Sequence, residues 1–497
     1  MNDAAGKRAC VIGAGFGGLA LAIRLQAAGV ATTLIEAREM PGGHARQWRR
    51  EGFTFDAGPT AILAPASLAE LWELTGHDIA GDVELLPISP FCRFNWPDGT
   101  LFDYSNDPRA LRAEVARLAP ADIAGFEQFL AYSASVRGES FGDLGARPSL
   151  VHAMVEAAPM LARHRAWRSL DGMIAQFIDN EKLRQMLSFP GLLVGGNPFT
   201  TSALHAQYHR LALEGGVWWP RGGMNRLAAG LARHFERLGG TLRLGDPVAR
   251  VHTLGTQATE VETQGGWRER FAAVASNADM VHSYRDLLGQ SPRGPRMARK
   301  LAKKRFSPSV FVVHLGIEGS WPGIPHHTVL FGPRWEGLLR DIHEHGVLPR
   351  DLAIHLNHPT VTDPSLAPEG KSVFQAFVPV AHLGKLAIDW DKVGPVLEKR
   401  VLEEVARRLI PDLSDRVVTK FHVTPRDLAR DLNAHLGSAY SLEPIPSQSA
   451  WFRPPNRDAV IGNFYLVGAG THPGAGIPAV VAGARATAAL MLEDLAR

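Results

Sequence analysis

One glycine-rich turn near the N-terminus, residues 13–18, limits what this chain can fold into more than any other feature. The short apolar run at 9–12 precedes it and predicts a buried parallel strand. Apolar residues at helical spacing follow the turn as far as Gly29, and a second strand-like run at 32–35 ends at Glu36. The order of strand, turn, helix and strand predicts a βαβ unit.

The spacing of the glycines predicts a dinucleotide site. Gly13 permits the tight turn, Gly15 lets the backbone approach a pyrophosphate, and Gly18 lets the helix pack close to the strand. The helix N-terminus favours anions. Glu36 follows Gly13 at the separation of about 20 residues at which an acid binds a ribose hydroxyl. A glycine turn without a ligand is the weaker interpretation.

A second glycine pair, Gly42 and Gly43, follows Glu36 within the next loop. It indicates which dinucleotide cofactor the site would bind. A nicotinamide domain usually continues into its next helix here. This loop and the Asp-Ala-Gly-Pro-Thr run at 56–60 resemble flavoproteins of the amine oxidase and phytoene desaturase superfamily, which fold the loop against FAD. That group often has arginine after the glycine pair. His44 holds the position here, and Arg46 is the candidate to replace it.

The C-terminal region repeats the order of strand, glycine-rich turn and helix that the N-terminal region shows. Residues 463–470 predict a strand that ends in glycines, 471–478 a turn, and 479–495 a helix whose N-terminus would face an anionic group. The turn contains Gly-Ala-Gly-Thr-His-Pro-Gly-Ala-Gly-Ile-Pro at 468–478, which resembles the signature of bacterial-type phytoene desaturases. The resemblance implies that this helix faces the flavin. His472 is a candidate either for a role beside the flavin or for shaping the backbone.

The resemblance covers essentially the whole chain and implies further parts of the site. The turn at 220–224 precedes a helix at 227–238 and a strand in which Val248 would pair with the adenine. The run at 271–279, which contains Asn277, resembles the small strand that closes the nucleotide domain. Other matching segments are 11–29, 192–198, 366–370 and 448–454.

Composition excludes several classes of protein. The two cysteines, Cys10 and Cys92, cannot form a disulfide framework, and we expect no metal site. A net charge of +3 is too small to indicate nucleic-acid binding. The charge-free segments 185–209 and 463–484 are interrupted by prolines and glycines, so neither predicts a membrane-spanning helix. The first strand begins almost at once and leaves no room for a signal peptide, which favours a cytoplasmic protein.

The middle of the chain predicts a substrate-binding part and a helical part. A Pro-Asp-Gly turn at 97–99 predicts a hairpin, and the region from 108 to 208 has helical spacing. The basic, aromatic end of 154–167 is either a solvated face or a lid that touches a membrane. The basic run 293–305 predicts an amphipathic helix that is either solvated or attracted to anionic lipid.

The resemblance implies an α/β fold in which a Rossmann-like FAD-binding domain is built from discontinuous segments. A mixed α+β substrate domain and a helical lid or membrane-facing domain complete it. The predicted boundaries are 1–85, 216–285 and 455–497 for the FAD-binding domain, 86–110 and 286–454 for the substrate domain, and 111–215 for the helical domain.

The implied activity is stepwise, FAD-dependent desaturation of phytoene, a lipophilic C40 polyene, to neurosporene or lycopene. The implied partners are the inner face of the cell membrane, as a peripheral surface, and a quinone or oxygen as electron acceptor. The alternatives are a related carotenoid desaturase, ketolase or isomerase, a flavin amine oxidase, and a non-catalytic lipid carrier of the GDP-dissociation-inhibitor type. No side chain is predicted to be catalytic, since Glu156, Arg163 and Arg168 are more typical of surface residues.

The glycine turns and the resemblance together predict one set of cofactor-binding residues. They are Gly13, Gly15, Phe16, Gly17, Gly18, Glu36, Ala37, Arg38, Gly43, His44, Ala45, Gly58, Pro59, Thr60, Val248, Asn277, Gly470, Gly476, Ile477 and Pro478.

Overall fold

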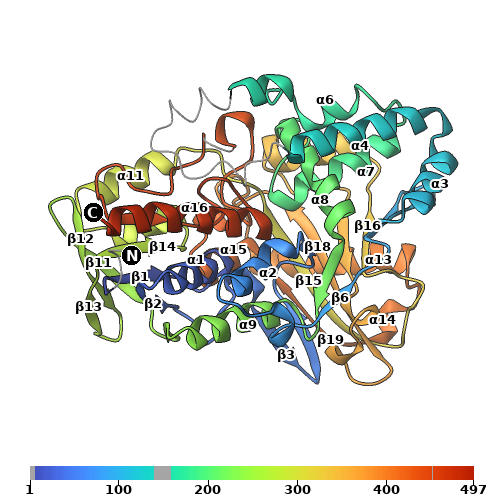
Figure 1. Cartoon of the computed structure of the whole chain (residues 1–497). Coiled ribbons are helices and arrows are strands. Elements are labelled where there is room, and N and C mark those ends of the chain that lie inside the picture. The colour runs from blue at the N-terminus through green and yellow to red at the C-terminus, as the bar shows by residue number, and fades with distance from the viewer. Residues whose placement is uncertain (1–5, 139–157, 450–451) are drawn as a thin grey trace.

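A computed structural model describes residues 6–138, 158–449 and 452–497 of the chain. One five-stranded sheet contains the two predicted N-terminal strands and is entirely parallel. The strands of this sheet come from four distant parts of the sequence (Figure 1). In spatial order the strands are β10 (Thr241–Arg243), β2 (Ala31–Ile35), β1 (Arg8–Ile12), β14 (Ala273–Ser276) and β20 (Phe464–Leu466). The predicted strand–turn–helix–strand unit at the N-terminus is confirmed.

The run at 271–279 contains one strand of this sheet, β14. β14 lies in the interior, paired with β1 on one side and with β20 on the other. Its apolar residues are all buried, which suits a central strand better than an edge strand. The position matters because the carboxyl end of β14 delivers Asn277 directly to the glycine turn after β1.

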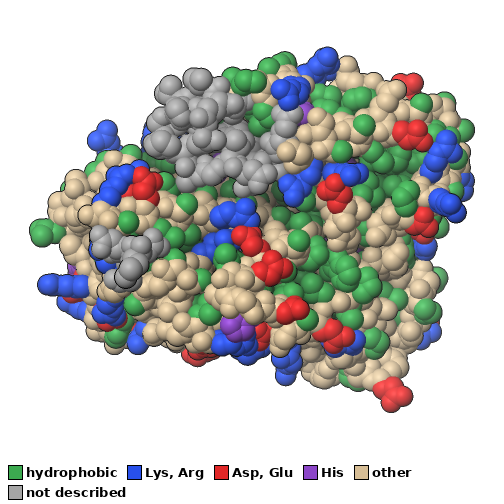
Figure 2. All heavy atoms as spheres, viewed as in Figure 1, with side chains coloured by type: hydrophobic (Ala, Val, Ile, Leu, Met, Phe, Trp, Pro, Cys, Tyr) green, Lys and Arg blue, Asp and Glu red, His purple; other side chains and the backbone are tan. Residues whose placement is uncertain are grey.

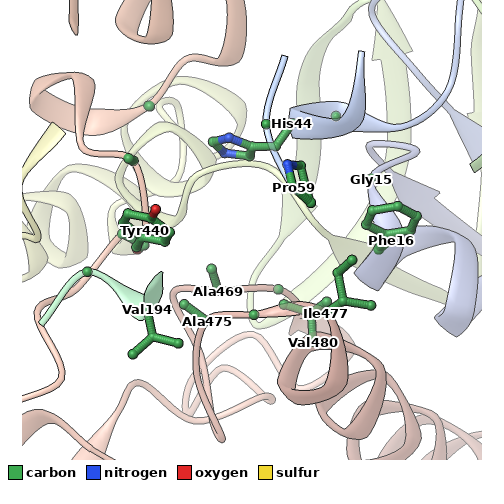
Figure 3. A pocket seen from close by; sticks show the side chains of 18 of the residues that line it. Gly15, Phe16, His44, Pro59, Val194, Tyr440, Ala469, Ala475, Ile477 and Val480 are labelled. Atoms are coloured by element: carbon green, nitrogen blue, oxygen red, sulfur yellow. The ribbon is translucent and has the colours of Figure 1, made fainter. Parts of the chain in front are cut away.

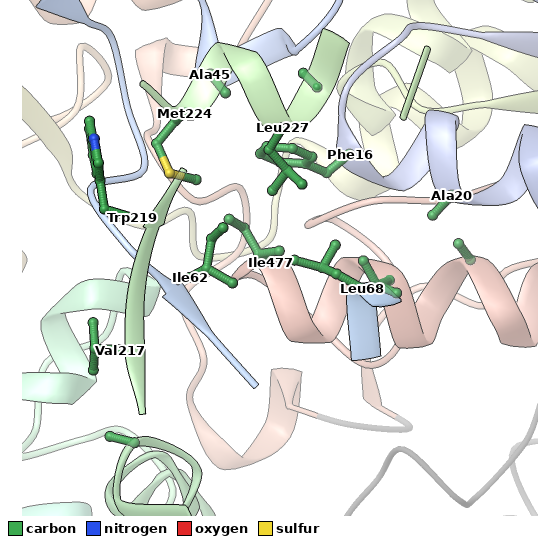
Figure 4. Close-up of a cluster of buried hydrophobic side chains, with 14 of the residues drawn as sticks. Phe16, Ala20, Ala45, Ile62, Leu68, Val217, Trp219, Met224, Leu227 and Ile477 are labelled. Carbon is green, nitrogen blue, oxygen red and sulfur yellow. The ribbon is translucent and has the colours of Figure 1, made fainter. Parts of the chain in front are cut away.

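Buried apolar side chains join the helices that cover this sheet. The first and last helices of the chain, α1 (Phe16–Ala27) and α16 (Ile477–Leu495), lie side by side (Figure 1). Phe16, Leu227 and Ile477 meet in the cluster of Figure 4, which also contains residues of α2 (Ala66–Glu73) and α9 (Met224–Arg237). This packing brings the N-termini of α1 and α16 close together, although they are separated by most of the sequence.

A mixed seven-stranded sheet forms the second layer of the molecule. Its strands in spatial order are β19 (Val417–Val423), β15 (Ser309–Glu318), β18 (Lys371–Val380), β17 (Ile354–Asn357), β16 (His327–Leu330), β7 (Cys92–Asn95) and β8 (Leu101–Tyr104). The predicted hairpin is confirmed as β7 and β8, and α13 (Trp390–Arg408) is a long helix of this part of the chain.

The described residues also form three small sheets. They are β11 (Val248–Leu254) with β12 (Gln257–Thr263) and β13 (Arg268–Arg270), then β3 (Gln47–Arg50) with β4 (Phe53–Asp56), and β5 (Ile62–Leu63) with β9 (Val217–Pro220) and β6 (Leu85–Pro87). Val248 begins the first of these sheets, so the predicted strand at that position is confirmed.

A group of helices gathers at one end of the molecule, beside the seven-stranded sheet (Figure 1). They are α3 (Pro108–Leu118), α4 (Ile123–Gly138), α6 (Leu170–Ile174), α7 (Glu181–Ser188) and α8 (Gln207–Gly215). Of the predicted helix at 154–167, residues 158–163 are helical, whereas Glu156 lies outside the described residues. No described helix combines the length and the apolar character that crossing a lipid bilayer requires.

The predicted basic helix is also present, as α11 (Arg293–Leu301). Two basic side chains of this region form ion pairs with buried acids of the chain. Arg293 pairs with Asp458 at 2.9 Å, and Arg305 pairs with Glu443 at 2.9 Å. On the face of the molecule seen in Figure 2, acidic and basic side chains are interspersed, in keeping with the net charge of +3.

Candidate active site

One long cavity of about 690 Å³ runs from the glycine turn of α1 to the aromatic side chains of the seven-stranded sheet. Figure 3 shows its middle, where His44, Pro59, Val194, Tyr440, Ala469 and Ile477 surround an open space. The volume lies in the range of about 300–1,000 Å³ that is usual for ligand pockets. The two ends of the cavity differ in chemistry.

The glycines of the N-terminal turn are required by close backbone packing. A Cβ at Gly18 would lie 2.0 Å from the carbonyl oxygen of Gly13, so only glycine lets α1 pack against β1 here. Cβ atoms at Gly15 and Gly17 would lie 2.7 and 2.6 Å from the amide group of Asn277. The Asn277 side chain therefore spans the turn, and the glycines make room for it as well as for a ligand.

Glu36 and Arg38 form the charged wall beside this turn. Glu36 is 5% exposed, and one carboxylate oxygen accepts the Ala14 N–H at 2.7 Å. Its other oxygen lies 3.5 Å from Nε of Arg38, whose guanidinium also donates to the carbonyl oxygen of Gly43 at 3.4 Å. Both side chains line the cavity. The acid is thus positioned at the end of β2, where the spacing predicted it.

The second glycine loop places His44, and not Arg46, at the cavity. Arg46 does not line it, because its guanidinium binds Asp431 at 2.6 Å and stacks over Trp48. Arg38 is the arginine that reaches the cavity wall beside this loop. Enclosure by the protein, together with the positive charges of Arg38 and Arg46, lowers the pKa of His44 to about 4. The ring is therefore neutral at pH 7.

The C-terminal turn delivers the uncapped N-terminus of α16 to the same cavity. Gly476 precedes the helix with φ 99°, and no side chain caps the helix start. Behind the turn, the buried guanidinium of Arg453 donates to the carbonyl oxygens of Ala469 at 2.7 Å and Leu442 at 3.0 Å. His472 does not line the cavity, and its carbonyl oxygen accepts the side-chain amide of Asn456 at 3.1 Å. Its backbone helps to shape the turn.

The structure brings together most of the predicted cofactor-binding residues. Gly18 and Ala45 do not line the cavity: Gly18 packs against Gly13, and Ala45 is fully buried. All the others line it, namely Gly13, Gly15, Phe16, Gly17, Glu36, Ala37, Arg38, Gly43, His44, Gly58, Pro59, Thr60, Val248, Asn277, Gly470, Gly476, Ile477 and Pro478.

These residues fit an FAD molecule in shape and in charge. Neither α1 nor α16 has a side-chain cap or an acidic residue in its first turn, so both helix starts can face anionic groups. The glycine turn leaves the backbone bare at the position of a diphosphate, and Glu36 can accept a ribose hydroxyl. Within the described residues, no group of His, Cys, Asp and Glu side chains is arranged to hold a metal ion.

The other end of the cavity is aromatic and was not predicted residue by residue. Its ring-bearing side chains include Phe91, Phe94, Tyr104, Phe189 and Phe377. The polar groups among them are satisfied within the chain. The Tyr104 hydroxyl bonds Nδ1 of His209 at 3.0 Å, and Nε2 of His209 lies 2.8 Å from the carbonyl oxygen of Leu187. This end suits a long apolar molecule.

Sequence reasoning also missed Tyr440, in a loop, and His327 and His355, on strands of the second layer, all of which line the cavity. No local motif marks them, because they are brought to the wall by the pairing of strands and loops that lie far apart in the sequence. Cys92, one of the two cysteines, lines the aromatic end as well.

The chain is similar to known proteins along its whole length. Residues 16–492 match the family described as flavin containing amine oxidoreductase. The phytoene desaturase (lycopene-forming) of Paracoccus sp. strain N81106 is 50% identical over 496 residues, which cover 100% of this chain and 99% of that protein. The phytoene desaturase (lycopene-forming) of Pantoea ananas is 48% identical over 490 residues, 98% and 100% of the two chains.

A solved structure shares the fold at much lower identity. The crystal structure of an oxidoreductase from Methanosarcina mazei has a TM-score of 0.66 with this chain at 18% identity, and the match covers 96% of this chain and 98% of that one.

Proposed function

Because the chain belongs to the phytoene desaturases within the flavin containing amine oxidoreductase family, we propose that it converts phytoene to lycopene with FAD. It is an oxidoreductase of carotenoid biosynthesis that acts on CH–CH groups. The single observation that carries the proposal is the cavity, whose polar end fits a dinucleotide and whose aromatic end fits a polyene. Lycopene is proposed as the product because the two relatives described above are lycopene-forming.

The residues at one end of the cavity would bind the cofactor, and those at the other end would bind the polyene. FAD, when bound, supplies the two-electron oxidant that a saturated carbon–carbon bond requires. The turn at 13–18, Glu36 and the N-terminus of α16 would hold the cofactor, while Asn277 fixes the turn. The aromatic end would orient the polyene and exclude water. A largely aromatic wall whose polar groups mostly bond within the chain suits repeated desaturation, because the polyene itself forms no hydrogen bonds that each step would have to break.

The product of the purified protein tests the proposed function. Incubation with phytoene in liposomes, FAD and an electron acceptor is expected to yield lycopene as the final carotenoid, identified by chromatography. Accumulation of neurosporene or ζ-carotene at complete turnover would contradict the product. Unchanged phytoene with FAD bound would contradict the activity, and a protein that binds no flavin would favour a lipid carrier.

We also propose that the chain works at the inner face of the cell membrane, since its substrate is insoluble in water. The supporting observation is α11, where Arg296, Arg299, Lys300 and nearby Lys303 are exposed. None of the four forms an ion pair with another residue in the described ranges, whereas Arg293 does. Such side chains are attracted to anionic lipid by about 1 kcal/mol each.

Binding to anionic liposomes tests this surface. Arg299→Gln combined with Lys300→Gln is expected to weaken binding by about 2 kcal/mol, roughly thirtyfold, because two of the exposed charges are lost. Cosedimentation at low salt measures it. Lys392→Gln with Lys399→Gln, which removes two exposed charges from α13, is the matched control. Equal binding by both double variants would overturn the proposed surface.

The electron acceptor is proposed to be a membrane quinone or oxygen. Lycopene formation under anaerobic conditions with added quinone would identify the quinone. Formation that depends on oxygen, with quinone present, would identify oxygen.

A further inference from the structure

Two histidines stand side by side where the two ends of the cavity meet. His327 begins β16, and its ring nitrogens lie 3.0 Å from the carbonyl oxygen of Phe91 and 3.2 Å from that of Thr60. His355 is on the neighbouring strand β17, with its ring centroid 5.2 Å from that of His327. Thr60 belongs to the loop predicted to contact FAD, so the pair borders the cofactor end of the cavity.

His355 is an available polar side chain in an otherwise aromatic wall. It lines the cavity, and its ring has no hydrogen-bond partner in the described part of the chain. The rings of Phe189 and Phe377 lie 5.8 and 5.9 Å from it, centroid to centroid. The His355 ring is only partly buried, and its nitrogens are not among the buried polar atoms that lack a partner, so they are open to a ligand in the cavity.

The proposed desaturation requires a group that accepts a proton. Forming each new double bond breaks two C–H bonds on adjacent carbons. One hydrogen leaves with its electron pair and reduces FAD by two electrons. The second leaves as a proton, and its electron pair becomes the new π bond. The proton needs an acceptor within reach of the reacting carbon.

We propose that His355 accepts this proton on a ring nitrogen, an assignment that rests on the proposed function. As the hydride leaves, positive charge develops on the polyene and is spread over its neighbouring double bonds. The faces of Phe189 and Phe377 favour that charge. A C–H bond beside such a carbon is strongly acidic, so a weak neutral base is sufficient. The imidazolium then releases its proton to water before the next step.

The surroundings of His355 keep its ring neutral, as a proton acceptor must be. Burial, with a smaller contribution from His327, lowers the pKa of His355 to about 3. The ring is therefore neutral and able to accept a proton at pH 7, and its conjugate acid releases the proton readily.

The other carboxylates and imidazoles of the cavity wall are less suitable. Each of the following is hydrogen-bonded to another group of the chain: Glu36, His209, Asp279, His282, His343 and Asp431. His44 lies between Arg38 and Arg46, and this cationic environment suits a phosphate oxygen better than a proton.

Replacement of His355 tests the assignment. In His355→Phe and His355→Gln, lycopene formation and the phytoene-dependent bleaching of bound flavin are expected to fall by about 10²- to 10⁴-fold, the usual effect of losing a general base. FAD content and melting temperature are expected to match those of the parent protein. The matched control is His358→Gln, which changes a buried histidine that follows β17 but does not line the cavity.

Chemical rescue separates catalysis from structure. Added imidazole is expected to restore part of the activity of His355→Ala, with a rate that follows the concentration of the neutral form. Parental rates in His355→Phe or His355→Gln, or activity of His355→Ala that imidazole does not change, would overturn the inference. If the parent protein itself leaves phytoene unchanged, the proposed function fails and the inference fails with it.

Discussion

Gly18→Ala is expected to give a protein that is purified without flavin. The added methyl group would lie 2.0 Å from the carbonyl oxygen of Gly13 and 3.2 Å from Cβ of Asn277. The first of these neighbours is backbone, so no change of rotamer can relieve the clash, and α1 must move away from β1. Overpacking of this kind typically costs about 1–3 kcal/mol of stability. Because the displaced N-terminus of α1 also loses its contact with the diphosphate, FAD affinity is expected to fall on the order of a hundredfold, about 3 kcal/mol.

The ratio of flavin absorbance to protein absorbance after purification measures this effect. Gly81→Ala is the matched control, because a methyl group there meets no atom within 4 Å. Full flavin content in Gly18→Ala would mean that the turn does not hold the cofactor in the way described. Loss of flavin in Gly81→Ala would show that the test lacks specificity.

Arg453→Met is expected to destabilise the C-terminal turn that faces the cavity. The Arg453 side chain is 4% exposed and donates to the carbonyl oxygens of Ala469 and Leu442. Burial lowers its pKa to about 10, so the guanidinium is still charged at pH 7. Hydrogen bonds to charged groups contribute about 1.5–3 kcal/mol each, so losing both is expected to cost about 2–4 kcal/mol after the desolvation of the charge is relieved.

Denaturant unfolding and FAD titration measure the consequence. Arg453→Lys is expected to be intermediate, because one ammonium group cannot reach both carbonyl oxygens as a planar fork does. Arg426→Met, which breaks an exposed ion pair with Asp391, is expected to leave the free energy of unfolding almost unchanged. Equal losses of stability in Arg453→Met and Arg426→Met would contradict the role of Arg453 in holding the turn.

The local elements were predictable because their signals are local. The turn at 13–18, with its flanking strands and helix, and the hairpin at 92–104 each lie within one short stretch of sequence. The glycine spacing also predicted that Glu36 would lie at the cavity, and it does. Nothing comparable indicated which strands would be neighbours in the sheet, so the interior position of β14 was not predicted.

The rest of the site depends on contacts between distant segments. Asn277 was predicted through a family resemblance, but its place across Gly15 and Gly17 follows from the order of strands in the sheet. His327 and His355 meet because β16 and β17 pair, and the carbonyl oxygen of Thr60 reaches His327 from the loop between β4 and β5. Periodicity and spacing carry no information about such contacts, so the available imidazole in the aromatic wall could be found only in three dimensions.

The central claim is that one cavity holds FAD at one end and a polyene at the other, close enough to react. The most direct measurement mixes the FAD-loaded protein with phytoene in liposomes, in the absence of oxygen and quinone, and follows the flavin absorbance. Bleaching that depends on phytoene, is absent with empty liposomes and is reversed by the electron acceptor is the result that we predict. A flavin that stays oxidised with phytoene, while a primary amine bleaches it, would contradict the account.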